Sequence, residues 1–142
     1  IVGVNFSELT KLTTIKAQAF SNNNIKEIVF AEGVKTIEYD AFRSNAITKV
    51  YFPNSLTTIG NQAFMSNKIK DIKFGSNLTS IGLMAFNGNL IEEINLPDTV
   101  TTLGNSVFSN NKLKKVVIPK GIISISDGAF LNNLIFVFVV PR

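Results

Sequence analysis

The sequence has no cysteine, no histidine and no tryptophan, and only two arginines and two tyrosines. Without cysteine or histidine, disulfides, zinc–thiolate clusters and imidazole bases are excluded, so we expect no metal site and no cofactor. Long apolar runs are also missing. The longest, residues 134–140, is too short to cross a bilayer, so we expect no membrane insertion. No basic segment followed by an apolar one opens the sequence, so we expect no signal peptide within it.

Charge of one sign is not concentrated anywhere in the chain. The net charge is +4, but lysines are mixed with acids, as in Lys70, Asp71 and Lys73, followed by Glu92 and Glu93. A groove for nucleic acid usually combines clustered basic residues with aromatic platforms, so we expect no nucleic-acid partner. Hydrophobic residues make up 45% of the chain and charged residues 17%, which is enough apolar surface for a buried core.

Catalytic signatures are missing as well. Glu92 and Glu93 are adjacent, and neighbours along a strand point to opposite faces, so these two carboxylates cannot flank one scissile bond. No Ser/His or Cys/His pair can form, and no glycine-rich phosphate loop occurs. We therefore expect that the chain is not an enzyme.

What the sequence does contain is a repeat of 22 residues. Phenylalanine recurs at this interval, and asparagine follows three residues after each phenylalanine: Phe20, Phe42, Phe64, Phe86, Phe108 and Phe130, with Asn23, Asn45, Asn67, Asn89, Asn111 and Asn133. Six positions of each repeat are apolar in every copy, and no single helical or strand period generates that set. The fixed period predicts stacked coils, because one repeat alone cannot bury its apolar positions.

The repeats begin at residues 12, 34, 56, 78, 100 and 122 and fill residues 12–142, while residues 1–11 resemble the end of a preceding, partial repeat. Both ends look cut, so we expect a fragment of a longer chain. Near the end of the third repeat, Ile72 and Phe74 alternate with Asp71 and Lys73, which predicts a strand with one buried face. Stacking the copies places these strands in a parallel ladder. A proline ends the strand in four of the six copies.

A second, shorter ladder is predicted on the opposite wall of the coils. Its marker is a Thr or Ser between two apolar residues in all six copies: Thr14, Thr36, Thr58, Ser80, Thr102 and Ser124. The segment that follows it, residues 61–64 in the third repeat, is predicted to form one tight helical turn. A corner rich in Asn, Ser and Gly, such as Ser66 and Asn67, closes this turn.

The recurring asparagines and phenylalanines allow two interpretations each. The asparagines form either a row that binds sugar or a set of side chains that satisfy backbone groups at the corners. The phenylalanines form either an aromatic binding strip or a stacked column inside the coils. Their recurrence in every copy, the terminal ones included, favours the structural interpretation of both sets.

The last repeat departs from the pattern. Phe136 and Val137 stand where earlier copies have Lys, Glu, Asp or Thr, and Val139 is a further apolar residue on the outward side of the same strand. Either a following segment covers this repeat, or it forms a surface for self-association or for a partner, because an exposed apolar strand recruits other strands.

The repeat resembles the BspA-type leucine-rich repeats of bacterial surface proteins. The match is carried by residues 78–86 (Leu-Thr-Ser-Ile-Gly-Leu-Met-Ala-Phe), by Asn89, and by residues 94–97 (Ile-Asn-Leu-Pro). The asparagine of commoner leucine-rich repeats is missing after the strand in most copies, which also fits the BspA type. The resemblance implies a mainly β, right-handed leucine-rich-repeat solenoid of six 22-residue repeats, with parallel β ladders and a concave strand face. It further implies an extracellular or cell-wall-attached protein that functions in adhesion.

We accordingly expect a non-catalytic module that binds a protein, either from the host (extracellular matrix or a receptor) or from another bacterium, on its concave face. The candidate ligand-binding residues are the outward ones of the strands: Glu27, Lys49, Tyr51, Asp71, Lys73, Glu93, Asn95 and Lys115. Tyr51 is either an anchor for the partner or a cross-strand neighbour of Val29 and Lys73. The alternative function is a structural spacer that projects another domain from the cell wall and has no ligand.

Overall fold

The computed structural model describes residues 2–141, which form short strands joined by turns and contain no helix. Residues 1 and 142, the outer ends of the predicted partial repeat (1–11) and solenoid (12–142), lie outside the described part. The strands are β1 (Gly3–Asn5), β2 (Thr14–Ile15), β3 (Glu27–Val29), β4 (Thr36–Ile37), β5 (Lys49–Tyr51), β6 (Thr58–Ile59), β7 (Asp71–Lys73), β8 (Ser80–Ile81), β9 (Thr102–Leu103), β10 (Lys115–Val117) and β11 (Val137–Val139).

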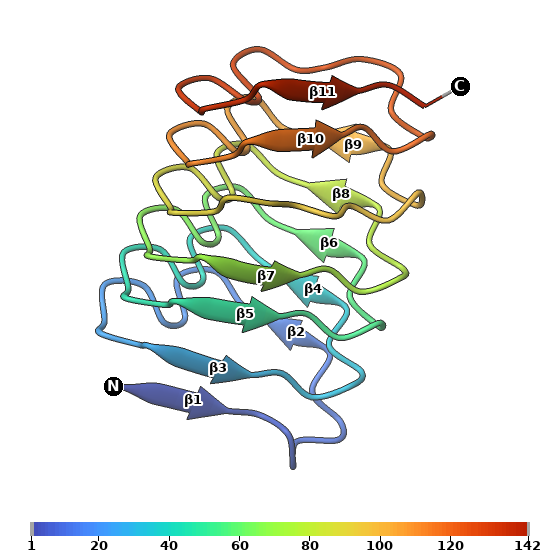
Figure 1. Ribbon diagram of the computed structural model, residues 1–142. Coiled ribbons are helices and arrows are strands. Elements are labelled where there is room, and N and C mark those ends of the chain that lie inside the picture. Colours follow the sequence, from blue (N-terminus) through green and yellow to red (C-terminus); the bar gives the residue numbers. More distant parts are fainter. Residues whose placement is uncertain (1, 142) are drawn as a thin grey trace.

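The strands form two parallel ladders on opposite walls of a right-handed solenoid (Figure 1). The long-strand ladder contains β1-β3-β5-β7 and, further along, β10-β11. The short-strand ladder runs β2-β4-β6-β8-β9 on the far side in Figure 1. We call each 22-residue repeat a coil and number the coils one to six from residue 12. The predicted mainly β leucine-rich-repeat solenoid is therefore confirmed.

The register of the ladders follows the period of the sequence. Glu27 pairs with Lys49, and Lys49 pairs with Asp71, so each step advances 22 residues. The first step, from Gly3 to Glu27, is two residues longer. Because the register is constant, identical side chains of successive coils lie against one another.

The short-strand ladder is shorter than the sequence predicts, and the long-strand ladder is interrupted. The short-strand ladder ends at β9, in coil five, and residues 124–125 of coil six form no strand. Ile123 is 96% exposed there, at the outward position that the exposed Thr79 and Thr101 occupy in earlier coils. In the long-strand ladder, coil four contributes only an isolated bridge between Glu93 and Lys115. The expectation of a strand in every copy is therefore wrong for coil six in the short-strand ladder and for coil four in the long-strand ladder.

The predicted helical turn at residues 61–64 is also wrong. Gln62 has a φ of 57°, in the left-handed region, and its N–H donates to the Leu83 carbonyl of the next coil at 2.7 Å. The N–H of Ala63 instead donates within its own coil, to Gly60 at 3.3 Å. A helix would keep both bonds inside one coil. The same left-handed position recurs in every coil, at Gln18, Asp40, Gln62, Met84, Ser106 and Gly128.

Phenylalanine fills the centre of the coils in two columns. In the first, rings from Phe20 to Phe130 stack with centroids 5.2 to 6.1 Å apart. The second contains Phe30, Phe52 and Phe74, whose neighbouring centroids are 5.6 and 5.7 Å apart. Phe42, Phe64, Phe86 and Phe108 are fully buried. These rings lie inside the solenoid and form no surface strip.

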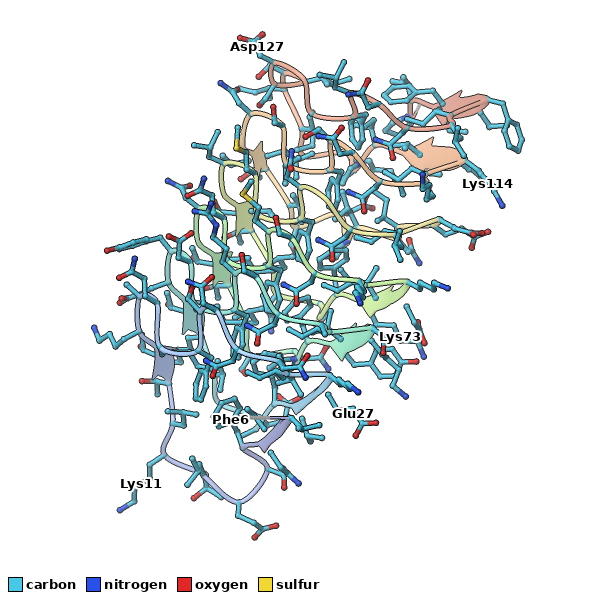
Figure 2. The ribbon with its side chains drawn as sticks, turned by 90° about the vertical axis from the view of Figure 1, so that its left-hand side faces the viewer. Phe6, Lys11, Glu27, Lys73, Lys114 and Asp127 are labelled. Atoms are coloured by element: carbon cyan, nitrogen blue, oxygen red, sulfur yellow. The ribbon has the colours of Figure 1, made fainter. Side chains whose placement is uncertain are left out.

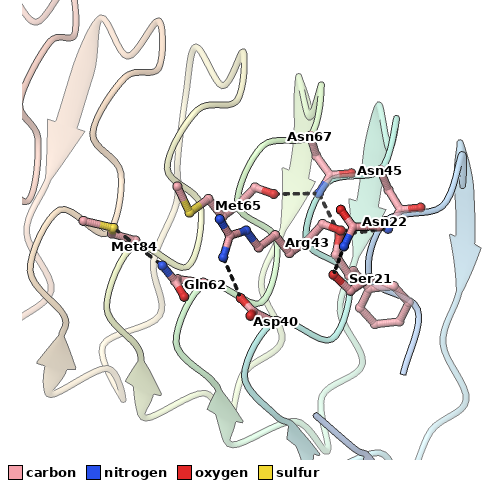
Figure 3. A network of polar contacts seen from close by, with 10 residues as sticks. Ser21, Asn22, Asp40, Arg43, Asn45, Gln62, Met65, Asn67 and Met84 are labelled. Atoms are coloured by element: carbon pink, nitrogen blue, oxygen red, sulfur yellow. Dashed lines mark hydrogen bonds and ion pairs between the residues drawn. The ribbon is translucent and has the colours of Figure 1, made fainter. Parts of the chain in front are cut away.

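The recurring asparagines form an asparagine ladder that joins each coil to the one before it (Figure 3). Asn67 donates from Nδ2 to the carbonyl of Phe64 in its own coil at 3.1 Å and to that of Phe42 in the preceding coil at 2.9 Å. Its Oδ1 accepts the N–H of Ile47 at 3.1 Å. The same bonds recur at Asn45, Asn89, Asn111 and Asn133. Side chains held in this way satisfy corner backbone groups and are not free to bind sugar.

Candidate functional site

The outward face of the long-strand ladder carries all the predicted binding residues. Burial alternates exposed–buried–exposed along β3, β5 and β10, so the first and third residues of these strands point to solvent. Glu27, Lys73 and Lys114 project from this wall of the solenoid, whereas Lys11 and Asp127 lie elsewhere (Figure 2). The eight predicted residues are all exposed: Glu27, Lys49, Tyr51, Asp71, Lys73, Glu93, Asn95 and Lys115.

Four of these residues meet in one arrangement, which we call the Tyr51 cluster: Lys49, Tyr51, Asp71 and Lys73. The hydroxyl of Tyr51 donates to Oδ2 of Asp71 at 2.5 Å. The Nζ atoms of Lys49 and Lys73 lie 5.0 and 4.5 Å from the centroid of the Tyr51 ring. Ladder pairing brings them together, because Lys49 is opposite Asp71 and Tyr51 is opposite Lys73.

The electrostatics of the cluster follow from these contacts. The hydrogen bond to Asp71 raises the pKa of Tyr51, because the neighbouring carboxylate favours the protonated phenol, and desolvation adds to the effect. Within residues 2–141, neither Lys49 nor Lys73 forms an ion pair with a carboxylate. Two ammonium groups are thus held over one aromatic ring by cation–π attraction, and both remain free to contact a partner.

The simpler interpretation of Tyr51, cross-strand pairing with Val29 and Lys73, applies to one neighbour only. Tyr51 pairs with Lys73, but the register between β3 and β5 includes only Glu27 and Lys49. Tyr51 is 39% exposed, so much of its ring remains available for contact.

The other predicted residues lie apart from the cluster. Glu27 is one strand away on β3, and Lys115 is on β10. Glu93 and Asn95 belong to coil four and line an open hollow of about 740 Å³ that separates them from Lys73. Neither this hollow nor the ion pair between Lys114 and Glu92 is predicted from the sequence. The Nζ and Oε2 atoms of that pair are 3.0 Å apart.

The apolar residues of the last coil also reach this face. Val137 pairs with Lys115 and Val139 with Val117, so both valines share the outward side of the ladder. Phe136 is 76% exposed. Self-association through Phe136, Val137 and Val139 stays a prediction.

Metal-binding clusters and membrane-spanning helices are both absent from the described part of the chain. Residues 2–141 contain no group of three or more His, Cys, Asp or Glu side chains that could hold a metal ion. The same residues include no helix long and apolar enough to span a membrane.

Comparison with solved structures finds the pneumococcal vaccine antigen PcpA, with a TM-score of 0.73 and 28% identity, over 88% of this chain. The match covers 32% of the PcpA chain, so the present chain spans about a third of that structure's length. A leucine-rich cell surface protein of Faecalibacterium prausnitzii A2-165 matches with a TM-score of 0.45 and 21% identity, over 92% of this chain and 51% of the other. A leucine-rich repeat protein of Bacteroides ovatus ATCC 8483 matches with a TM-score of 0.43 and 16% identity, over 86% and 44%.

Among curated proteins, a search with this sequence finds no match. The family comparison is decisive, because the BspA type leucine rich repeat region matches residues 6–136 with six copies. This range covers nearly the whole chain, including every recurring asparagine and phenylalanine and all strands except β1 and β11. The chain therefore belongs to the BspA-type leucine-rich repeat family.

Proposed function

We propose that this chain is a non-catalytic interaction module of an extracellular or cell-wall-attached bacterial protein, and that it binds a macromolecular partner on the outward face of the long-strand ladder. The observation that carries the proposal is the Tyr51 cluster. It presents an exposed aromatic ring, one carboxylate and two lysines on adjacent strands, and neither lysine has a carboxylate partner within residues 2–141. Tyrosine is among the residues that most often dominate binding energy at interfaces.

The scaffold suits such a role because its structural and surface positions are separate. Phe64 and Asn67 are buried and stack on their copies, while the outward residues change from coil to coil. A surface of this kind varies without disturbing the core. The similarity to PcpA, a pneumococcal vaccine antigen, supports a position at the bacterial surface.

The size of the face limits what it can bind. Strands of three residues are about 10 Å long, and six coils at about 4.8 Å each extend about 29 Å. The flat area is therefore about 300 Å², well below the roughly 800 Å² that each partner buries in a standard interface. A partner must either be narrow or extend onto the flanking turns, and the cluster must supply much of the affinity.

The test is binding of immobilised extracellular-matrix proteins (collagen, fibronectin and laminin) and of host-cell receptors by wild type, Tyr51→Ala and Lys73→Glu. We expect Tyr51→Ala and Lys73→Glu each to weaken binding at least tenfold, since each removes a contact group of the cluster. Tyr39→Ala is the matched control, because Tyr39 is also exposed but lies in the turn region outside both ladders. Equal binding by Tyr51→Ala and wild type would refute the proposal.

A spacer function is favoured by one observation. Outward charges alternate along the ladder from Glu27 to Lys49 to Asp71, so neighbouring strands neutralise one another without a ligand. If the wild-type protein binds no matrix protein, host-cell receptor or bacterial surface, the spacer is the better assignment.

A further inference from the structure

The long-strand ladder is open between coils three and four. Strand β7 pairs with β5 over all three of its residues. On its other edge, none of the interstrand backbone hydrogen bonds within residues 2–141 joins residues 70–74 to residues 92–96. The backbone of coil four accordingly passes between β7 and β10 without forming a strand (Figure 1). We call this opening, between residues 70–74 and 92–95, the ladder gap.

We infer an electrostatic cause for the gap. At the first outward position, Glu27 is opposite Lys49, Lys49 is opposite Asp71, and Glu93 is opposite Lys115. Closing the gap in the same register would instead place Asp71 directly opposite Glu93. Paired strands are about 4.8 Å apart, and like charges that face each other at this spacing are destabilising. This is the one step of that row, from Glu27 to Lys115, at which two carboxylates would meet.

The gap exposes groups that paired strands normally cover. Ile72 is only partly buried, whereas Val50 and Val116, the equivalent residues of β5 and β10, are fully buried. Phe74 is also partly buried, although Phe52 is 7% exposed. The resulting hollow of about 740 Å³ is within the range of roughly 300–1,000 Å³ typical of ligand sites.

We propose that the ladder gap binds an extended peptide segment, which pairs as a parallel strand with the free edge of β7. The proposal rests on the proposed function of this face in protein binding and names the form of the partner. A strand that adds to an open edge gains affinity from main-chain hydrogen bonds and specificity from alternate side chains. A single extended segment also fits the narrow face, on which a globular partner could bury a standard interface only by extending onto the flanking turns.

The residues that flank the gap specify the chemistry of the peptide. A side chain placed between Asp71 and Glu93 faces two carboxylates, so Lys or Arg is favoured there. The next side chain points inward between Ile72 and Ile94, where Val or Ile fits. The one after that lies beside Lys73 and is favoured as Glu or Asp. The expected segment is therefore basic–apolar–acidic.

The experiment uses the whole chain, isotopically labelled, and the synthetic peptide acetyl-Ser-Thr-Lys-Val-Glu-Ile-Ser-amide. Nuclear magnetic resonance titration reports which amides shift and the dissociation constant. We expect shifts concentrated in residues 70–74 and 92–96. The matched peptide with Glu in place of Lys should bind at least tenfold more weakly, although its two negative charges suit the net charge of +4. N-methylation of the glutamate should also weaken binding, because in the register of the ladder its N–H donates to the Ile72 carbonyl on the free edge of β7.

A protein variant tests the cause of the gap. Glu93→Gln removes one of the two facing carboxylates without placing a lysine opposite Lys115, so the ladder closes and binding of the Lys peptide is weakened. Glu8→Gln makes the same change in net charge at an exposed site outside the long-strand ladder and should leave binding unchanged. Equal affinity for the two peptides, or no shifts at the gap with either, overturns the inference.

The same titration separates this inference from the proposed function. Tyr51→Ala frees Asp71 and Lys73 from their contacts with Tyr51 but should keep the peptide site, because both residues remain on β7 and Tyr51 does not line the hollow. If matrix or receptor binding depends on Tyr51 but no peptide binds, the gap inference fails and the proposed function stands. If the peptide binds the gap but Tyr51→Ala leaves matrix and receptor binding unchanged, the gap inference is supported and the Tyr51 proposal fails.

Discussion

Removal of the Asn67 side chain tests the asparagine ladder most directly. In Asn67→Ala, the carbonyl of Phe42 still accepts from Asn45, and the carbonyl of Phe64 still accepts from Asn89. The N–H of Ile47 loses the acceptor that the side chain of Asn67 provides, and Ile47 is fully buried. The cost is therefore dominated by one orphaned donor and not by the number of bonds removed.

The magnitude follows from that donor. An unsatisfied buried backbone group costs about 1–3 kcal/mol, and the weakened carbonyl contacts add a smaller amount. We expect Asn67→Ala to lower the free energy of unfolding by about 2–3 kcal/mol. The matched control is Asn23→Ala, because Asn23 is exposed and donates only within its own coil, to Phe20 and Ser21. The control should cost less than about 1 kcal/mol.

Urea denaturation of the three proteins gives the unfolding free energies, and hydrogen exchange gives a local measure. The Ile47 amide should exchange roughly 30- to 150-fold faster in Asn67→Ala, the factor that corresponds to about 2–3 kcal/mol. The reasoning would be refuted if Asn67→Ala were as stable as wild type, or no less stable than Asn23→Ala.

Four further predictions follow from the core, the close packing of the coils and the binding face. Phe64→Ala should lower the unfolding free energy by about 3–5 kcal/mol in urea denaturation, since it empties a fully buried position of the column; wild-type stability would contradict the packing. Gly104→Ala should lower the thermal midpoint, because a Cβ there would lie 2.2 Å from the backbone nitrogen of Leu83; an unchanged midpoint would show that the coils can separate. Asp71→Asn should lower the pKa of Tyr51 in an ultraviolet titration by removing the carboxylate that raises it. The hydrogen bond stabilises the fold below the ordinary tyrosine pKa of about 10 and is lost as pH rises through the raised pKa; an unchanged Tyr51 titration would contradict this cause. Glu93→Gln should raise the unfolding free energy by about 0.2–1 kcal/mol in urea denaturation by relieving repulsion across the gap. Hydrogen exchange at residues 71–73 should slow as the gap closes, and unchanged exchange there would argue against closure.

Much of the fold can be predicted from the sequence because one period controls register, core and ladders together. Phe64 and Asn67 recur at a fixed interval, so their copies must stack in any structure that pairs the repeats in register. The left-handed backbone at Gln62 could not be predicted in this way. Gln, Asp, Met, Ser and Gly all occupy that position, so the conformation is imposed by bonds to the next coil and not by residue type.

The candidate site was predictable in part. The outward position of Tyr51 follows from strand alternation, but its bond to Asp71 depends on the side-chain conformations of both residues. The sequence does contain one sign of the ladder gap. Aligning the repeats places Asp71 directly before Glu93 at the first outward position, so two carboxylates are neighbours there. Whether the strands that carry two like charges pair or separate depends on the energy of the whole ladder, which cannot be obtained from the aligned residues alone.

The asparagine ladder has a consequence for how proteins of this kind change length. Each coil carries the asparagine side chain that satisfies backbone groups of the preceding coil, so every repeat offers the same bonds to whichever repeat precedes it. Excision of residues 56–77 would bring Asn89 to the Phe42 carbonyl and the Ile47 amide, in place of those of Phe64 and Ile69. Duplication or loss of whole repeats in a gene would thus lengthen or shorten the solenoid without leaving any corner of the backbone unsatisfied.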